Sequence, residues 1–113
     1  MKITLAHGDV ILRPITKEEY EKLISEAERV KHNGSFILAL GETTGHRHII
    51  TAERADTMTV HKLKDGRGVI MLTAPAKITH EEHEALETTE TYYIQEYERE
   101  YDWFQKSVRK VQD

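Results

Sequence analysis

Cysteine is absent from this chain of 113 residues, and long apolar runs are absent as well. Without cysteine the protein can form neither a disulfide nor a thiolate metal site, so any metal ion must be bound by histidine, carboxylate or carbonyl groups. The longest apolar runs, residues 35–40 and 69–72, are far shorter than the roughly 20 residues of a membrane-spanning helix. The first residues also do not lead into the hydrophobic region of a signal peptide. We therefore expect a cytoplasmic protein that has no membrane partner.

A basic patch is also lacking. The net charge is −4, and residues 81–100 contain eight glutamates and a single arginine, Arg99. Surfaces that bind nucleic acids usually carry clustered lysine and arginine, because the phosphate backbone dominates the affinity. An acidic region of this kind would repel a phosphate backbone, so we expect no nucleic-acid partner.

One helix is predicted in the N-terminal half of the chain. Thr16 followed by Glu19 forms a capping box, a typical helix start. Apolar residues within 20–30 recur at the spacing of one helix face, and Gly34 would follow the helix as part of a left-handed C-cap. The prediction is a helix over about residues 17–31.

Most of the remaining chain is predicted to be β-structure. Strands are predicted over 10–15, 46–51, 58–64, 67–74 and 91–101, with a buried apolar segment over 35–40. Asp65-Gly66 between two of these segments is a strong hairpin signal. Residues 78–90 are polar and indicate a long loop, and residues 102–111 indicate a short C-terminal helix. The pattern favours a single domain over residues 1–113, mainly β and α+β by content, built as a small antiparallel β-barrel or sandwich.

The chemically specific feature is a set of paired histidines. Seven histidines are present, and four of them form the pairs His46/His48 and His80/His83. Residues two apart on a strand project to the same face, and residues three apart in a turn do so as well, so each pair could offer two imidazoles to one ion. Imidazole with nearby carboxylate suits a divalent transition metal such as zinc, iron, manganese or nickel. We predict one shared metal site.

Two other interpretations of these histidines stay open. They could be surface or turn residues that hydrogen-bond to the backbone, or they could move protons without a metal, since imidazole titrates near neutral pH. The metalloprotease motif is excluded, because it requires histidines four residues apart, whereas His80 and His83 are three apart and position 84 is Glu.

The spacing around the first pair resembles a known family motif. Gly41, His46-x-His48 and Glu53 resemble the first metal-binding motif of the cupins. This resemblance implies a small cupin-like β-barrel with a metal ion inside, and it implies a ligand role for His46, His48 and Glu53.

A second resemblance covers most of the chain. Small uncharacterised bacterial and phage-type proteins share Gly8-Asp9-Val10, Gly41-Glu42-x-Thr44-Gly45-His46-x-His48, Thr79-His80-Glu81-Glu82-His83 and Arg99-Glu100-Tyr101. The resemblance implies no assigned activity. It implies that both histidine pairs belong to one pattern.

Three functions are therefore compatible with the sequence. The first is a metal-binding β-barrel with His46, His48, His80, His83 and Glu53 as ligands, in which the metal is either catalytic or structural. The second is a non-enzymatic interaction module, a homo-oligomer with histidines at the subunit interface. The third is an accessory protein of a phage or mobile element that binds another protein through residues 81–100.

Overall fold

The computed structural model describes residues 4–7, 10–40, 47–79, 85–97 and 108–111. This part of the chain is mainly β, with one α-helix, α1 (Lys17–Ile24), and one short 3₁₀ helix, η1 (Ala55–Thr57). The strands are β1 (Thr4–His7), β2 (Val10–Pro14), β3 (Glu28–Val30), β4 (Ser35–Leu40), β5 (Arg47–Ala52), β6 (Met58–Lys62), β7 (Gly68–Leu72), β8 (Ala76–Thr79), β9 (Leu86–Glu87), β10 (Tyr92–Tyr97) and β11 (Val108–Val111). No helix among these residues is long and apolar enough to cross a membrane.

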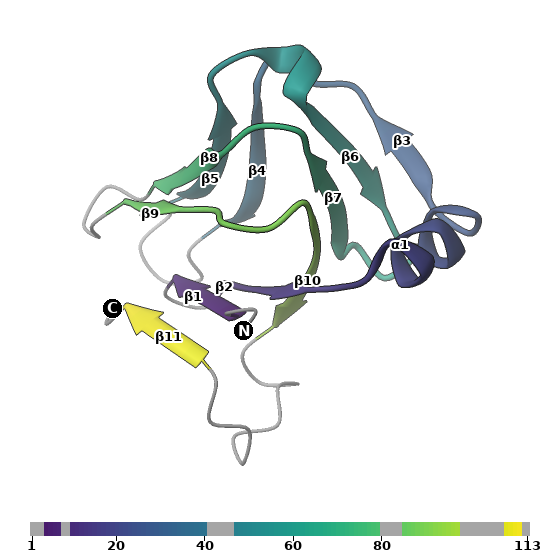
Figure 1. Cartoon of the computed structure of the whole chain (residues 1–113), viewed down its shortest axis with the longest axis horizontal. Helices are drawn as coiled ribbons and strands as arrows, with labels where there is room; N and C mark the ends of the chain where they lie inside the picture. Colours follow the sequence, from purple (N-terminus) through teal and green to yellow (C-terminus); the bar gives the residue numbers. More distant parts are fainter. Residues whose placement is uncertain (1–3, 8–9, 41–46, 80–84, 98–107, 112–113) are drawn as a thin grey trace.

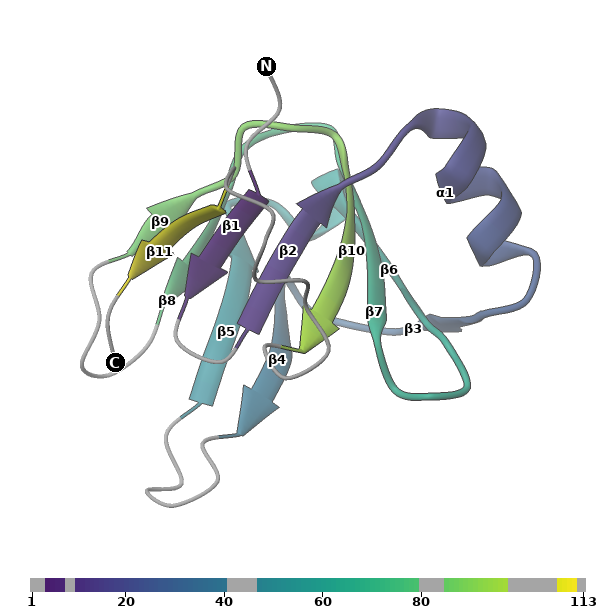
Figure 2. The ribbon, with the colours of Figure 1, turned by 90° about the horizontal axis from the view of Figure 1, so that it is seen from below.

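The strands of the described residues form two sheets, which curve around a common interior (Figures 1 and 2). The large sheet has the order β11-β1-β2-β10-β7-β6-β3, and the small sheet has the order β4-β5-β8-β9. Neighbouring strands are antiparallel except β1 and β11, which are parallel. The sequence predicts a barrel or a sandwich; the described residues form two sheets and not a closed barrel, because no ladder joins the two sheets.

The main core lies between the two sheets. Leu12 and Tyr93 from the large sheet, and Ile50 and Ile78 from the small sheet, are completely or almost completely buried there. Burying an isoleucine or leucine side chain contributes about 1.5–3 kcal/mol to folding. This shared core fixes the inward-facing side of β5 and β8, and therefore the direction in which His48 points.

A second, smaller core lies under α1 on the outer face of the large sheet. Tyr20 of α1 packs with Val69 of β7 and Ile94 of β10. Ile70, next to Val69, belongs instead to the main core. Strand β7 is apolar on both faces because both of its faces are covered, one by the small sheet and the other by the helix.

The predicted helix over about 17–31 starts correctly and ends too late. Thr16 Oγ1 accepts a hydrogen bond from the Glu19 N–H, and the Glu19 carboxylate accepts one from the Thr16 N–H, so the capping box is confirmed. The helix ends at Ile24, and Glu28–Val30 forms β3, which pairs with β6. Pairing with a neighbouring strand outweighs the local helical spacing at these residues.

The predicted C-terminal helix over 102–111 is wrong for its last residues. Val108–Val111 forms strand β11 beside β1, whereas residues 102–107 lie outside the described part of the chain. A strand at the edge of a sheet gains main-chain hydrogen bonds from its neighbour, and a single-sequence pattern does not contain that neighbour.

Candidate functional site

His48 is the only predicted metal ligand that the structure describes in a buried position. It lies on β5 with 3% of its surface exposed, on the same face as the buried residues Ile50 and Ala52. The residues between them, Ile49 and Thr51, are more exposed, as the alternation of a strand requires. The imidazole of His48 therefore points into the region between the two sheets.

Strand β8 lies beside this part of β5. The two strands are antiparallel, with Ile49 opposite Thr79 and Ile50 opposite Ile78. The residue before Ile49 is His48, so the beginning of β5 and the end of β8 lie at the same end of the small sheet (Figure 1).

Glu53 lies at the opposite end of β5. It follows Ala52, the last residue of the strand, and it is exposed to solvent. Four residues of β5 lie between it and His48, so the two Cα atoms are five residue steps apart, roughly 16 Å at about 3.3 Å per residue. The structure therefore does not bring Glu53 and His48 together.

The other three predicted ligands, His46, His80 and His83, lie outside the described residues. Within residues 4–7, 10–40, 47–79, 85–97 and 108–111, no group of three histidine, aspartate or glutamate side chains is arranged to hold a metal ion. Of the predicted site, the structure thus describes His48 and Glu53 alone.

His32 has a structural position between the sheets. Its Nδ1 accepts a hydrogen bond of 3.0 Å from the Gly34 N–H, so the proton of the neutral ring is on Nε2, which donates to the Met58 carbonyl at 2.6 Å. Since both ring nitrogens are used, His32 in this arrangement is not free to bind an ion. It connects β6 of the large sheet to the residue before β4 of the small sheet.

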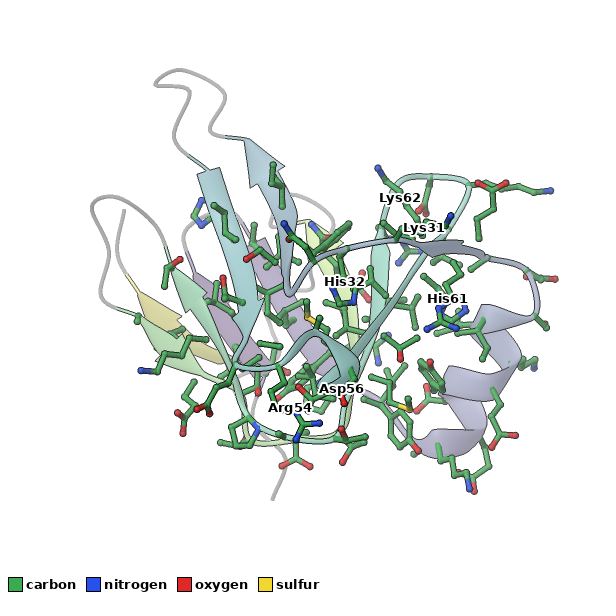
Figure 3. The ribbon with its side chains drawn as sticks, turned by 90° about the horizontal axis from the view of Figure 1, so that it is seen from above. Lys31, His32, Arg54, Asp56, His61 and Lys62 are labelled. Atoms are coloured by element: carbon green, nitrogen blue, oxygen red, sulfur yellow. The ribbon has the colours of Figure 1, made fainter. Side chains whose placement is uncertain are left out.

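An open groove of about 690 Å³ lies beside His32. One wall is formed by residues 29–32, and the other side contains Ala55, Asp56 and the start of β6. Asp56 forms an ion pair of 2.6 Å with Arg54, and both side chains are exposed (Figure 3). The groove is of small-molecule size, and the cations Arg29 and Lys31 on one wall give it a positive side.

His61 lies on the other face of the large sheet, beside α1 (Figure 3). Its ring meets the Tyr20 ring edge-on, with the ring centroids 6.3 Å apart. Nδ1 of His61 is buried and has no hydrogen-bond partner among the described residues. Burial, and next the positive charge of Arg29, lower the pKa of His61 below its usual 6.5, so the ring is neutral at neutral pH.

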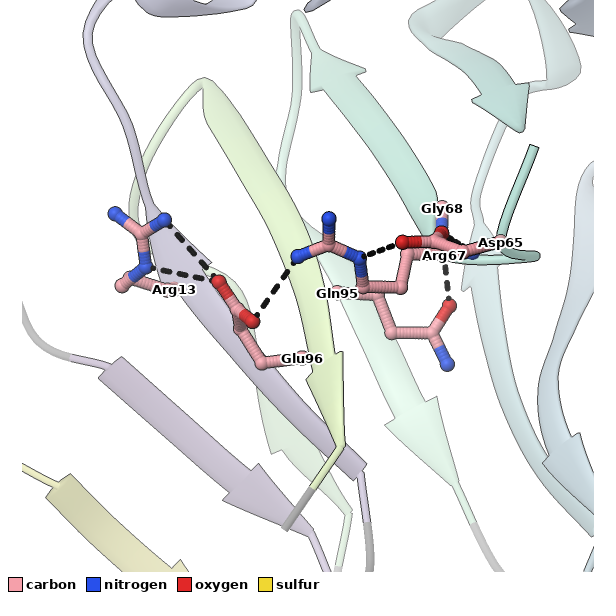
Figure 4. Close-up of polar contacts among 6 residues, drawn as sticks. All are labelled: Arg13, Asp65, Arg67, Gly68, Gln95 and Glu96. Carbon is pink, nitrogen blue, oxygen red and sulfur yellow. Dashed lines mark hydrogen bonds and ion pairs between the residues drawn. The ribbon is translucent and has the colours of Figure 1, made fainter. Parts of the chain in front are cut away.

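Polar residues that the sequence interpretation missed form a network on β10. The Glu96 carboxylate accepts hydrogen bonds from Arg13 of β2 and from Arg67, and Arg67 also pairs with Asp65 (Figure 4). The next residue, Gln95, is 1% exposed and faces the main core. The sequence contains one signal for this network. Gln95 lies between Tyr93 and Tyr97 on the alternating face of the strand, and a polar side chain on an inward face needs hydrogen-bond partners.

The chain was compared with protein-family models, curated proteins and solved structures. A search of curated proteins and a search of solved structures find no match, so the cupin-like fold is unconfirmed. A family model described as a domain of unknown function matches residues 6–96. Since this model covers well over half of the 113 residues, the chain belongs to the DUF8820 family of domains of unknown function.

Proposed function

We propose that the protein binds one divalent transition metal ion, such as zinc, iron, manganese or nickel, through histidines at the end of the small sheet where β5 begins and β8 ends. The observation that carries the proposal is the register of these two strands, with Ile49 opposite Thr79. In the sequence, His48 directly precedes Ile49 and His80 directly follows Thr79. Because consecutive Cα atoms are about 3.8 Å apart, the Cα atom of His80 is that far from the Cα atom of Thr79, the last residue of β8.

The alternation along β8 also supports the proposal. Ala76 and Ile78 are buried, whereas Lys77 and Thr79 are exposed. If this alternation continues for one residue, the side chain of His80 faces inward, on the same side of the sheet as His48. Directly opposed side chains on neighbouring strands have Cβ atoms about 4.5–5.5 Å apart. Two imidazoles at that separation can bind one ion with bonds of about 2.0–2.1 Å.

The remaining ligands of the proposal follow from the sequence. His46 precedes His48 by two residues, the spacing of side chains on one face of a strand, and His83 follows His80 by three residues. We leave Glu53 out of the proposed ligand set, because β5 holds it at the opposite end. Three histidines would leave a position for water, whose pKa the ion would lower, whereas a fourth histidine would close the shell and make the ion structural.

The burial of His48 fits this chemistry. At 3% exposure, His48 is held in position by the packing around β5.

The test is metal analysis of protein purified without a histidine tag. After loading with zinc and removal of free metal, we expect about one ion per chain, and this value should fall to near zero in His80→Ala and in His48→Gln. His61→Gln is the matched control, since His61 lies on the other face of the large sheet. Cobalt substitution gives a direct readout, because tetrahedral cobalt(II) absorbs strongly in the visible range.

Two outcomes would overturn the proposal. The first is wild-type protein that retains no zinc, and the second is unchanged zinc content in the folded His80→Ala variant. Measuring molecular mass with and without a chelator further distinguishes an ion within one chain from an ion that joins two chains, since chelation would dissociate only the latter assembly.

A further inference from the structure

Strand β3 forms one edge of the large sheet. It pairs with β6 on one side, with Arg29 opposite His61 and Val30 opposite Val60. On its other side no strand of the described residues is paired with it. An edge of this kind presents main-chain N–H and C=O groups to which another extended chain can bind.

The hydrogen bonds of β6 identify which groups of β3 face outward. The Leu63 N–H donates to the Arg67 carbonyl, and the Thr73 N–H donates to the Thr57 carbonyl, so odd-numbered residues of this strand bond toward β7. Main-chain groups alternate in direction along an antiparallel strand. Even-numbered residues of β6 therefore bond toward β3, and the Met58 carbonyl, which accepts from His32 on that side, agrees with this direction.

It follows that Val30, opposite Val60, uses its main-chain groups for β6, whereas the N–H and C=O of Arg29 point to the free edge. Lys31, two residues after Arg29, directly follows the strand, and by the same alternation its main-chain groups also point to the free edge. Both side chains are exposed (Figure 3 labels Lys31). Within the described residues neither cation pairs with a carboxylate, and Asp56 across the groove is already paired with Arg54.

These charges decide which partner fits the edge. In an antiparallel pairing of two copies, outward-facing residues must oppose each other, so Arg29 would face either Arg29 or Lys31 of the second copy. Like charges directly opposite each other destabilise a sheet, and opposite charges stabilise it. The edge thus disfavours a second copy and favours a strand that carries carboxylates.

We propose that the free edge of β3 binds an extended acidic segment of a partner protein as an added strand. The Arg29 N–H and C=O would form the main-chain hydrogen bonds, and the side chains of Arg29 and Lys31 would select glutamate or aspartate at alternate positions of the segment. This site is independent of the proposed metal site, which lies on the small sheet.

The probe is a fluorescein-labelled peptide of about six residues, a common strand length, in which glutamate alternates with valine. Fluorescence anisotropy at low ionic strength is expected to detect binding of this peptide to the wild-type protein. The matched peptide with lysine in place of glutamate is expected not to bind. Arg29→Ala should weaken binding about twofold to fivefold, the usual effect of one cross-strand charge pair. Lys77→Ala, which removes an exposed cation from β8, is the control and should leave binding unchanged.

Arg29→Pro separates strand addition from simple charge attraction. Proline removes the outward N–H of residue 29 and leaves the hydrogen bonds between β3 and β6 in place. Edge strands accept proline at positions whose N–H faces away from the sheet. We expect it to bind about fivefold more weakly than Arg29→Ala, the usual effect of one lost hydrogen bond. Equal binding by these two variants would overturn the proposal.

Amide hydrogen exchange tests the same contact without any substitution. Saturating peptide should slow exchange of the Arg29 N–H in the wild-type protein, and an unchanged rate would overturn the proposal. Equal binding of the lysine peptide, or a wild-type dimer that Arg29→Pro dissociates, would overturn it as well.

Discussion

The side-chain amide nitrogen of Gln95 donates a hydrogen bond of 2.6 Å to the main-chain carbonyl of Leu38, and so joins β10 of the large sheet to β4 of the small sheet. The amide oxygen of the same side chain accepts from the Gly68 N–H at 3.1 Å (Figure 4). Together with His32, which bridges Met58 and Gly34, this glutamine connects the sheets by side chains where no main-chain ladder does.

Replacing Gln95 with leucine should therefore destabilise the protein by about 3 kcal/mol, because two buried main-chain groups lose their partners. The free energy of unfolding in urea measures this loss. Glu87→Gln, on an exposed position of β9, is the control and should change stability by less than about 0.5 kcal/mol. A Gln95→Leu variant as stable as the wild type would mean that the sheets do not depend on this connection.

Gln95→Glu gives a second test of the same contact. The carboxylate can still accept from the Gly68 N–H, but when ionised it cannot donate to the Leu38 carbonyl. Burial penalises the charge as well. This variant should be less stable than Gln95→Leu or similar to it at neutral pH, and it should recover part of the loss in acid, where the protonated carboxyl group can donate.

Gly34 has a backbone conformation that other residues rarely adopt, with φ of +112°. A Cβ atom added there would lie no closer than 3.7 Å to its neighbours, so the site has room for a methyl group. The cost of Gly34→Ala should therefore come from the backbone alone, about 2 kcal/mol. Thermal unfolding checks this, with the exposed neighbour Asn33→Ala as control, and equal midpoints for the two variants would contradict it.

The parts of the fold that the sequence predicts well depend on residues close together in the chain. The capping box of Thr16 and Glu19 and the hairpin at Asp65-Gly66 are local, and both are present. The polar composition of residues 78–90 predicts a loop, yet these residues contain the end of β8 and all of β9. Strand β9 has only two residues, Leu86 and Glu87, which are too few for an alternating pattern.

The remaining features depend on contacts between distant residues. Glu28–Val30 continues the helical spacing of α1, but β6 lies beside it and it pairs as a strand. The sequence predicts that Gly34 ends the helix, whereas in the structure it lies in the connection from β3 to β4. For the candidate site, the histidine pairs are visible in the sequence. That β5 and β8 are neighbours, and that Glu53 is far from His48, becomes visible only from the strand pairing in the small sheet.

Glu96 connects the hairpin of β6 and β7 to β2. One carboxylate oxygen accepts from Arg13 at 3.1 Å and the other from Arg67 at 3.2 Å, and the Glu96 side chain is only 15% exposed. Because the two arginines are more exposed, we expect Glu96→Gln to cost about 1 kcal/mol, and less in 1 M salt, where screening weakens ion pairs. The matched control is Asp56→Asn, which breaks the largely exposed pair with Arg54 and should cost under about 0.5 kcal/mol. An equal effect of the two substitutions would mean that the Glu96 network contributes no more than a surface pair.

The pH dependence of stability should contain a contribution from His61. Its pKa is lowered in the folded protein, first by burial and then by Arg29, whose side chain comes from the neighbouring strand. A histidine whose folded pKa lies below its unfolded value of 6.5 binds fewer protons in the folded state than in the unfolded state, so acid favours unfolding. Stability should therefore be fully present above pH 6.5 and decrease below it, until the pH passes the folded pKa of His61.

His61→Gln removes this group and should make the unfolding free energy less dependent on pH between neutral and mildly acidic conditions. Arg29→Ala should have a smaller effect in the same direction, because it removes only the second cause of the shift. Urea unfolding at a series of pH values measures both variants, and NMR titration of the His61 ring gives its folded pKa directly. Since Nδ1 of His61 has no partner among the described residues and the ring lies against Tyr20, protonation would put an unpaired charge beneath α1. A measured folded pKa at or above 6.5 would contradict this account, because the packing of α1 over His61 would then not exclude water from the ring.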